Sequence, residues 1–271
     1  MVPGRCLRVF GRGRHWMPCS IVFAFELGDK CKMGKGLHQL GKVWNPVTGC
    51  TKYSDGCQHC YALDRIIPLM KNERYKNGAM VTCHDDLLDM PRKRKSAGAF
   101  FVNNMGDVFH EDVPFSFLQE VFRTMNECPR HIFRALTKRT PRMLECAPQL
   151  KWSENIWMGV TVEGGKYDFR IDDLRKVPVR NRFVMFEPLL GPVGKINLDG
   201  ISLALVGGES GIGFREMETD WVREIRDQCI ASGVKFNFMQ YAAVDPRTLG
   251  RILDGREWKE LPDDTAQLSL W

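Results

Sequence analysis

Short apolar runs alternate with helical stretches through most of this chain, and that alternation restricts the possible folds more than any other feature. The runs long enough to form strands are residues 43–47, 80–83, 99–103, 131–136, 156–162, 182–186, 201–206 and 235–240. Amphipathic segments such as 114–127 and 219–232 lie between them and carry apolar residues at helical spacing. Strand–helix alternation is typical of a parallel α/β sheet or barrel. The sequence therefore predicts an α/β fold with parallel strands.

The number of strand candidates bears on the type of barrel. Eight candidates favour a complete TIM-like (β/α)8 barrel over a partial (β/α)6-type barrel. With 271 residues, of which 44% are hydrophobic, the chain can bury one large core. The segment after Pro192 is too short for a confident helix, so this βα unit is weak, as is the first. Neither an internal repeat nor an interdomain linker is evident, which indicates a single domain over residues 37–271.

The positive charge is concentrated at the start of the chain. Residues 1–36 contain seven Lys or Arg against Glu26 and Asp29, a balance of +5 out of the total of +6. This segment has no clear period, so we expect a poorly ordered basic arm, or an upstream extension of a protein that begins at Met33. A targeting peptide is the third reading, although such peptides are poor in acidic residues. The nearly neutral remainder gives little support for a wide nucleic-acid surface.

Ten cysteines are scattered through this large chain, without a credible signal peptide, which indicates a reducing cytoplasm rather than a disulfide framework. No apolar run approaches the roughly 20 residues that span a bilayer, so no membrane contact is expected. Three cysteines are grouped as C-x6-C-x2-C: Cys50, Cys57 and Cys60. Three thiolates on one loop leave one coordination position open, which suits catalytic zinc or a cluster iron. His59 is a possible fourth ligand, and three free cysteines without a metal are the plainer alternative.

Polar residues follow most of the predicted strands, where a parallel barrel builds its site. Beyond the cysteines, the candidate ligand-binding residues are Asn103, Asn104, Lys138, Arg139, Glu163, Glu187, Gly207, Gly208 and Glu209. Each has a purely structural alternative. The asparagines could cap a turn, the basic pair could cap a helix instead of holding a carboxylate or phosphate, the acids could form ion pairs, and the glycines could allow a tight turn.

The motif W-N-P-V-T-G-C at residues 44–50, with C-x6-C-x2-C-Y, resembles a family of phage and prophage proteins that is similar to an outlying branch of the radical S-adenosylmethionine (SAM) enzymes. The resemblance extends through F-V-N-N-M-G-D at 101–107, L-T-K-R at 136–139, E-P-L-L-G-P at 187–192 and G-G-E-S-G at 207–211, and covers roughly residues 42–262. It implies a barrel with a 4Fe-4S cluster. The usual radical SAM spacing is C-x3-C-x2-C, so the first gap here is longer.

The resemblance also implies a chemistry. The three cysteines would hold three irons, SAM would chelate the fourth, and one electron from a flavodoxin- or ferredoxin-type reductant would release a 5′-deoxyadenosyl radical. Gly207, Gly208 and Glu209 resemble the Gly-Gly-Glu motif that contacts SAM in that superfamily, where it normally follows the second strand. The substrate is unknown, and the phage setting suggests nucleic acid or a nucleotide. The alternative is a non-radical phage protein that binds or processes nucleic acid, with zinc or an iron–sulfur centre at the same cysteines.

Overall fold

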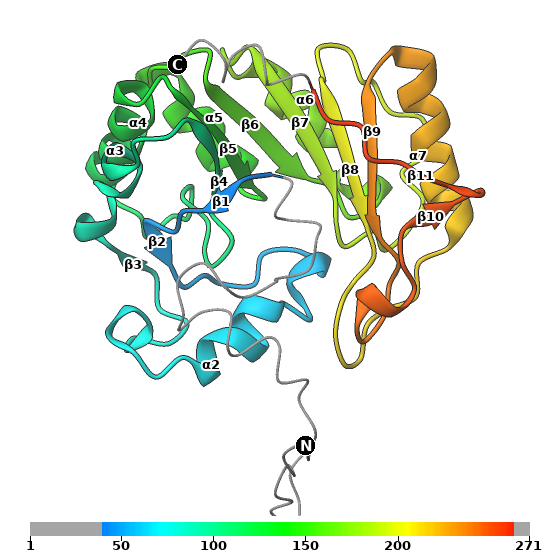
Figure 1. Ribbon diagram of the computed structural model, residues 1–271, viewed down its shortest axis with the longest axis horizontal. Coiled ribbons are helices and arrows are strands. Elements are labelled where there is room, and N and C mark those ends of the chain that lie inside the picture. The colour runs from blue at the N-terminus through cyan, green and yellow to red at the C-terminus, as the bar shows by residue number, and fades with distance from the viewer. Residues whose placement is uncertain (1–39, 263–271) are drawn as a thin grey trace, which may run out of the picture. The chain divides into compact units, whose positions relative to one another are not determined.

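Seven parallel strands form the main sheet of the computed structural model, which describes residues 40–262. They are β1 (Lys42–Val43), β4 (Gly98–Val102), β5 (His131–Thr137), β6 (Ile156–Thr161), β7 (Asn181–Phe186), β8 (Leu203–Gly207) and β9 (Lys235–Gln240). Their order in the sheet is their order in the chain. The sheet curls, and β1 and β9 are its two unjoined edges within the described part of the chain (Figure 1). The fold is a partial, TIM-like half-barrel.

The prediction of eight strands and a complete barrel was wrong, because one candidate pairs elsewhere. The run at 80–83 contributes only β3 (Thr82–Cys83), which pairs antiparallel with β2 (Val47–Thr48) outside the main sheet. The candidate at 43–47 is likewise divided, since Lys42–Val43 alone joins the sheet, beside β4. The composition of a short apolar run does not indicate which other strand it will pair with. The sequence therefore predicted more barrel strands than the sheet contains.

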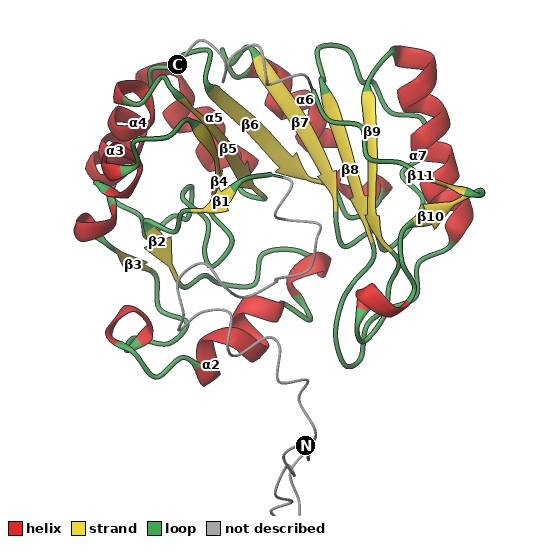
Figure 2. Ribbon diagram, in the orientation of Figure 1, coloured by secondary structure: helices red, strands yellow, loops and turns green. Residues whose placement is uncertain are grey.

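The main helices cover the outer face of the curled sheet (Figure 2). They are α4 (Phe115–Glu127), α5 (Thr140–Cys146), α6 (Phe169–Lys176) and α7 (Thr219–Ser232). The last ends at Gly233, whose φ of 67° closes the helix in the left-handed conformation that glycine tolerates. The shorter elements are the π-helical turn Ala62–Ile66, α2 (Ile67–Leu69), α3 (Met90–Lys93) and the hairpin of β10 (Ile252–Leu253) and β11 (Arg256–Glu257). No described helix separates β7 from β8.

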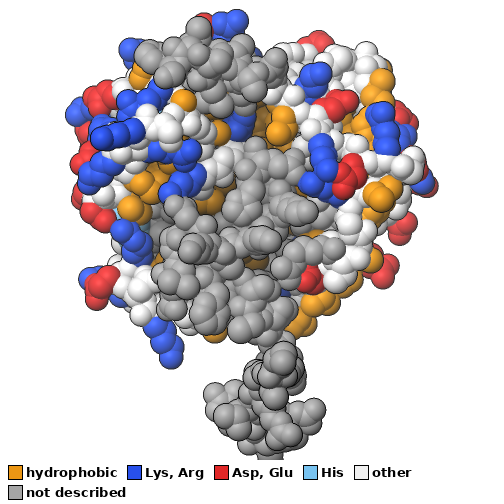
Figure 3. Space-filling model, viewed as in Figure 1, with side chains coloured by type: hydrophobic (Ala, Val, Ile, Leu, Met, Phe, Trp, Pro, Cys, Tyr) orange, Lys and Arg blue, Asp and Glu red, His pale blue; other side chains and the backbone are white. Residues whose placement is uncertain are grey.

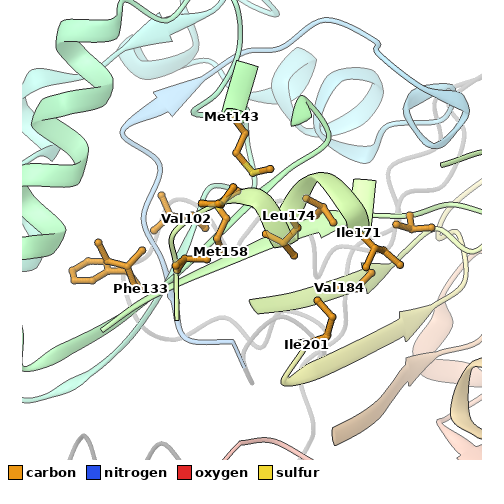
Figure 4. Packing of buried hydrophobic residues seen from close by; sticks show 14 of the residues in the cluster. Val102, Phe133, Met143, Met158, Ile171, Leu174, Val184 and Ile201 are labelled. Atoms are coloured by element: carbon orange, nitrogen blue, oxygen red, sulfur yellow. The ribbon is translucent and has the colours of Figure 1, made fainter. Parts of the chain in front are cut away.

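Two apolar clusters bury the two faces of the sheet, as expected for parallel strands. The larger lies between the sheet and the helices, where Met158 and Val184 pack with Leu174 of α6 (Figure 4). The smaller lies on the concave face and includes Phe101, Trp157, Phe183, Met185 and Leu205. Because side chains alternate along a strand, residues two positions beyond these apolar groups, such as Asn103 and Glu187, face the concave side at the carboxyl ends. The concave face of the sheet is therefore apolar along the strands and polar at their carboxyl ends.

The predicted basic arm, residues 1–36, lies outside the described residues. None of the described helices is both long enough and apolar enough to cross a membrane.

Candidate functional site

The cysteine loop, residues 50–60, lies at the carboxyl ends of the parallel strands, where Figure 1 draws it in light blue between β2 and α2. Gly49 anchors its start: the amide donates to the Met105 carbonyl at 2.9 Å, just beyond β4. Gly49 has φ of 80°, and a Cβ there would meet the Met80 carbonyl oxygen at 2.1 Å. Only glycine fits this approach, so the loop enters the site along a fixed path.

Three arginine–glutamate pairs hold the cysteine loop, and the first lies at its beginning. Arg139, directly after β5, pairs with Glu111 and donates from Nη2 to the carbonyl and the hydroxyl of Thr51 at 3.1 and 2.8 Å. The same nitrogen lies 3.8 Å from Cys50 Sγ, and the guanidinium lies 4.6 Å from the centre of the Tyr53 ring. The side chain is 3% exposed. Arg139 therefore fixes the segment that carries Cys50.

The second pair lies under the middle of the loop. Glu163, after β6, pairs with Arg170 of α6 at 2.7 Å, and each side chain is only 1% exposed. Ser54 Oγ donates to the other carboxylate oxygen of Glu163 at 2.5 Å. Because Arg170 and Glu163 form an ion pair in the interior, neither charge is buried without a partner, which would cost several kcal/mol of stability. Glu163 is thus a support for the loop.

The third pair contacts the loop around Cys57. Glu209, after β8, is 4% exposed and accepts from Arg215 Nη2 at 2.5 Å and Nε at 3.0 Å. Arg215 Nη2 also donates to the Asp55 carbonyl at 3.0 Å, and Nη1 lies 3.3 Å from Gln58 Oε1. His59 Nδ1 lies 3.1 Å from Glu209 Oε2. The possible fourth metal ligand, His59, therefore has one ring nitrogen engaged with a carboxylate.

The two asparagines after β4 differ in their bonding. Asn104 makes two hydrogen bonds with Asn45. Its side-chain Oδ1 accepts from Asn45 Nδ2 at 2.8 Å, and its backbone N–H donates to Asn45 Oδ1 at 2.9 Å. Asn103 is 4% exposed, yet neither its Nδ2 nor its Oδ1 has a hydrogen-bond partner in the described structure. A buried unpaired amide costs about 1–3 kcal/mol. Asn103 therefore has open hydrogen-bonding capacity at the position expected for a ligand.

Lys138 and Glu187 also retain bonding capacity. The Lys138 side chain is 23% exposed, and its Nζ lies 4.0 Å from Glu163 Oε1, beyond hydrogen-bond distance. Glu187 accepts one bond, from Gln240 Nε2 at 2.9 Å. Burial raises the pKa of Glu187 to about 7, against the opposing effect of the Lys138 charge. The mouth of the half-barrel thus holds an ammonium group beside a carboxyl that is partly protonated at neutral pH.

The two glycines after β8 have a packing reason for their small size. A Cβ on Gly207 would lie 3.1 Å from the Glu187 carboxylate, and one on Gly208 would lie 2.2 Å from the Ala242 amide nitrogen. The Gly208 carbonyl accepts from Gln240 Nε2 at 3.0 Å. Close packing against Ala242 is thus enough to require a glycine at position 208, and a role of both glycines in ligand contact stays a prediction.

The thiols of Cys50, Cys57 and Cys60 are free and half-buried. Burial raises the pKa of Cys50 to about 11, with a further contribution from the Asp107 carboxylate. Within residues 40–262, no three His, Cys, Asp or Glu side chains gather closely enough to hold a single metal ion. An iron–sulfur cluster takes each thiolate on a different iron, and so accepts a wider triangle of sulfurs than one ion does. Three cysteine thiols on one loop are the type of donor set that such a cluster takes.

The other cysteines within residues 40–262 lie outside this loop. Cys128, Cys146 and Cys229 are buried, and half-buried Cys83 lies in β3, which pairs with β2.

Some supports of the site carried no sequence signal. Arg170 belongs to an amphipathic helix in which an arginine is ordinarily solvent-facing, yet it is 1% exposed. Arg215 stands in a segment without periodicity, and its partners near Cys57 are more than 150 residues away in the chain. Each was missed because its role depends on a tertiary contact.

The basic run Arg92-Lys93-Arg94-Lys95 is a candidate contact for nucleic-acid phosphates, and its two arginines have partners within the fold. Arg92 bonds to Glu127 and Asp89, and Arg94 bonds to the Ser96 carbonyl. Figure 3 shows Lys and Arg side chains interspersed with acidic ones over the region where Figure 1 places α3. Of the aromatic side chains Trp44 and Tyr53, which could stack on bases, Trp44 is fully buried and Tyr53 is 41% exposed. Within the basic run at 92–95, Arg92 is therefore the residue whose charge is paired with carboxylates.

The fold and the site define a class of protein, a parallel α/β half-barrel with a cysteine-bearing loop at the carboxyl ends of its strands. The chain belongs to the family described as a protein of unknown function, DUF5131, whose model matches residues 36–262. No curated protein matches the chain.

Two solved structures of spore photoproduct lyase variants are similar to the chain, and one of them contains a dinucleoside spore photoproduct. Each is 12% identical, with TM-scores of 0.40 and 0.39, and each match covers 69% of this chain. The chain matches 60% of the length of each lyase structure.

Proposed function

We propose that this protein is a radical SAM-type enzyme that holds a 4Fe-4S cluster through Cys50, Cys57 and Cys60. The observation that carries the proposal is the position of the cysteine loop. Hydrogen bonds and ion pairs tie it to residues that follow β5, β6 and β8, so three half-buried thiols stand over the concave face of the half-barrel. Sites of barrel enzymes lie at this end of the strands.

The residues at the mouth fit the groups that SAM would bring. Asn103 offers an unpaired buried amide, Lys138 an ammonium without a hydrogen bond among the described residues, and Glu187 a carboxyl with one oxygen that accepts no bond there. We assign these three to contacts with the amino, carboxylate and ribose groups of SAM. When bound, the cluster and SAM supply reductive cleavage of a carbon–sulfur bond, and a flavodoxin- or ferredoxin-type protein supplies the electron.

The protein's own contribution is positioning and exclusion of water. Arg139, Glu163 and Glu209 have their charges met by protein partners, and we assign them to holding the loop rather than to direct contact with the cofactor. Below them, Phe183, Met185 and Leu205 close the concave face with apolar side chains. A site of this kind keeps a reactive species away from solvent.

For the substrate, we favour a nucleotide or another small molecule over a long polynucleotide. Arg92 of the 92–95 run is already paired with Glu127 and Asp89, which leaves it poorly placed to neutralise phosphates. Binding of single-stranded DNA or RNA with a steep salt dependence, flattened by neutralising residues 92–95, would instead indicate a phosphate backbone.

The proposal is tested by measuring iron and sulfide after anaerobic reconstitution. Cys50→Ala, Cys57→Ala and Cys60→Ala should each lose the cluster, whereas Cys229→Ala, a change of a buried cysteine in α7, should retain it. Equal iron retention in all four variants contradicts the assignment. Colourless protein that contains zinc and no sulfide would favour the non-radical alternative.

A further inference from the structure

Arg215 joins the loop after β8 to both sides of Cys57. Its guanidinium bonds to Glu209 through two nitrogens, to the Asp55 carbonyl at 3.0 Å, and approaches Gln58 Oε1 at 3.3 Å. Asp55 is two residues before Cys57 in the sequence, and Gln58 is the residue directly after Cys57. One side chain therefore joins Glu209, after β8, to two residues of the cysteine loop that flank Cys57.

Glu209 extends the bridge to the neighbourhood of Cys60. Its Oε2 lies 3.1 Å from His59 Nδ1 and also accepts from the Arg215 amide at 2.9 Å. Its own backbone is fixed, because the Glu209 carbonyl accepts from the Ala243 amide at 3.1 Å beside β9. The 4% exposed carboxylate thus links the last part of the cysteine loop to the sheet.

The remaining supports act elsewhere on the loop. Arg139 contacts Thr51 and approaches Cys50, and Glu163 accepts from Ser54. Among the described residues, side-chain contacts from the segments after β6 and β8 to residues 55, 58 and 59 come from Arg215, Glu209, Tyr167 and Lys166. The last two contact Asp55 alone. The contacts from outside the loop to Gln58 and His59 therefore come from Arg215 and Glu209. Within the loop itself, Lys52 Nζ also donates to the Gln58 carbonyl at 2.7 Å.

We infer that Arg215 is a positioning residue for Cys57 and Cys60, acting with Glu209 to fix the spacing of these two thiols. The inference rests on the proposed function where it concerns the cluster, and it deepens that proposal by assigning a role to a residue outside every motif. Groups that orient metal ligands commonly alter metal affinity 10- to 100-fold when removed. Arginine suits the role because its planar fork makes several directed bonds at once, which lysine cannot do.

The cluster-loaded protein provides the first test, through the rate of iron loss to a chelator and the midpoint potential. Arg215→Ala should lose iron about tenfold faster than wild type or more. Arg215→Lys keeps the positive charge, so its midpoint potential should match that of wild type. It lacks the planar guanidinium, so iron retention should recover only in part. The matched control is Arg223→Ala on α7, which removes an arginine paired with Asp254 away from the cysteine loop and should match wild type.

The double variant Arg215→Ala/Glu209→Gln separates positioning from an unpaired charge. If fast iron loss in Arg215→Ala came only from leaving the Glu209 carboxylate buried, the double variant would recover. We expect the fast loss to persist there, because the bridge to Asp55 and Gln58 is still missing.

The apo protein provides a second test that does not need a cluster. Thiol alkylation followed by mass spectrometry should show Cys57 and Cys60 reacting severalfold faster in Arg215→Ala, with Cys50, on the Arg139 side, unchanged. Wild-type protein that takes up no iron would contradict the proposed function, and the alkylation rates would still decide the role of Arg215. Unchanged rates at Cys57 and Cys60 in Arg215→Ala would overturn the inference.

Discussion

Gly56 of the cysteine loop lies directly against Glu163, so closely that a Cβ on Gly56 would come within 2.6 Å of Glu163 Cγ. Glu163 cannot readily withdraw, because Arg170 bonds its second oxygen at 2.7 Å and both side chains are buried. The glycine is therefore required by close approach to a fixed ion pair. The arrangement sets how deeply the loop lies over the sheet.

The variant Gly56→Ala tests this contact. Overpacking against a buried pair should lower the free energy of unfolding by about 1–3 kcal/mol and reduce iron per protein after reconstitution. Gly191→Ala is the matched control, because a Cβ at Gly191 meets no atom within 4 Å. It should change stability by less than about 0.5 kcal/mol. Indistinguishable urea midpoints for the two variants would show that the cysteine loop can shift away from Glu163 at little cost in stability.

The raised pKa of Glu187 predicts a pH dependence of stability. The carboxyl binds its proton more tightly in the folded protein, with a pKa of about 7, than at the ordinary value of 4.5. Wild-type stability should therefore fall as the pH rises through this window. Glu187→Gln lacks the titration, so its free energy of unfolding relative to wild type should rise by about 1–3 kcal/mol between pH 4.5 and 7.5. A difference that does not vary with pH, measured by urea unfolding of apo protein, would refute this.

The two asparagines after β4 should respond oppositely to replacement. Asn103→Leu removes an amide that has no partner, so the apo protein should not lose stability. Asn104→Leu breaks the bond from Asn45 and should cost about 1–2 kcal/mol. In cluster-loaded protein, calorimetry should show SAM affinity at least about tenfold weaker in Asn103→Leu. Wild-type SAM affinity in this variant would remove Asn103 from the cofactor site.

Much of the fold followed from the sequence, because buried parallel strands and amphipathic helices have distinct patterns. The expectation of an α/β, TIM-like barrel is confirmed in its partial form. The number of barrel strands was not predictable, since the run at 80–83 has the composition of a sheet strand and pairs with β2 instead.

The site was predictable to a smaller extent. Arg139, Glu163 and Glu209, three of the polar residues predicted at strand ends, contact the cysteine loop, and their binding of a cofactor stays a prediction. The pattern did not indicate that these three side chains already form ion pairs within the protein. Such pairing depends on tertiary contacts with residues such as Arg170 and Arg215. The binding of a cluster and of SAM stays a prediction.

The most direct test of the central claim is the product of SAM cleavage. Anaerobically reconstituted protein is reduced with dithionite in the presence of SAM, and 5′-deoxyadenosine is measured by chromatography and mass spectrometry. The account predicts 5′-deoxyadenosine from wild type and from Cys229→Ala, and none from Cys57→Ala. Wild-type protein that carries its full iron and sulfide, yet leaves SAM intact under reduction, would contradict it.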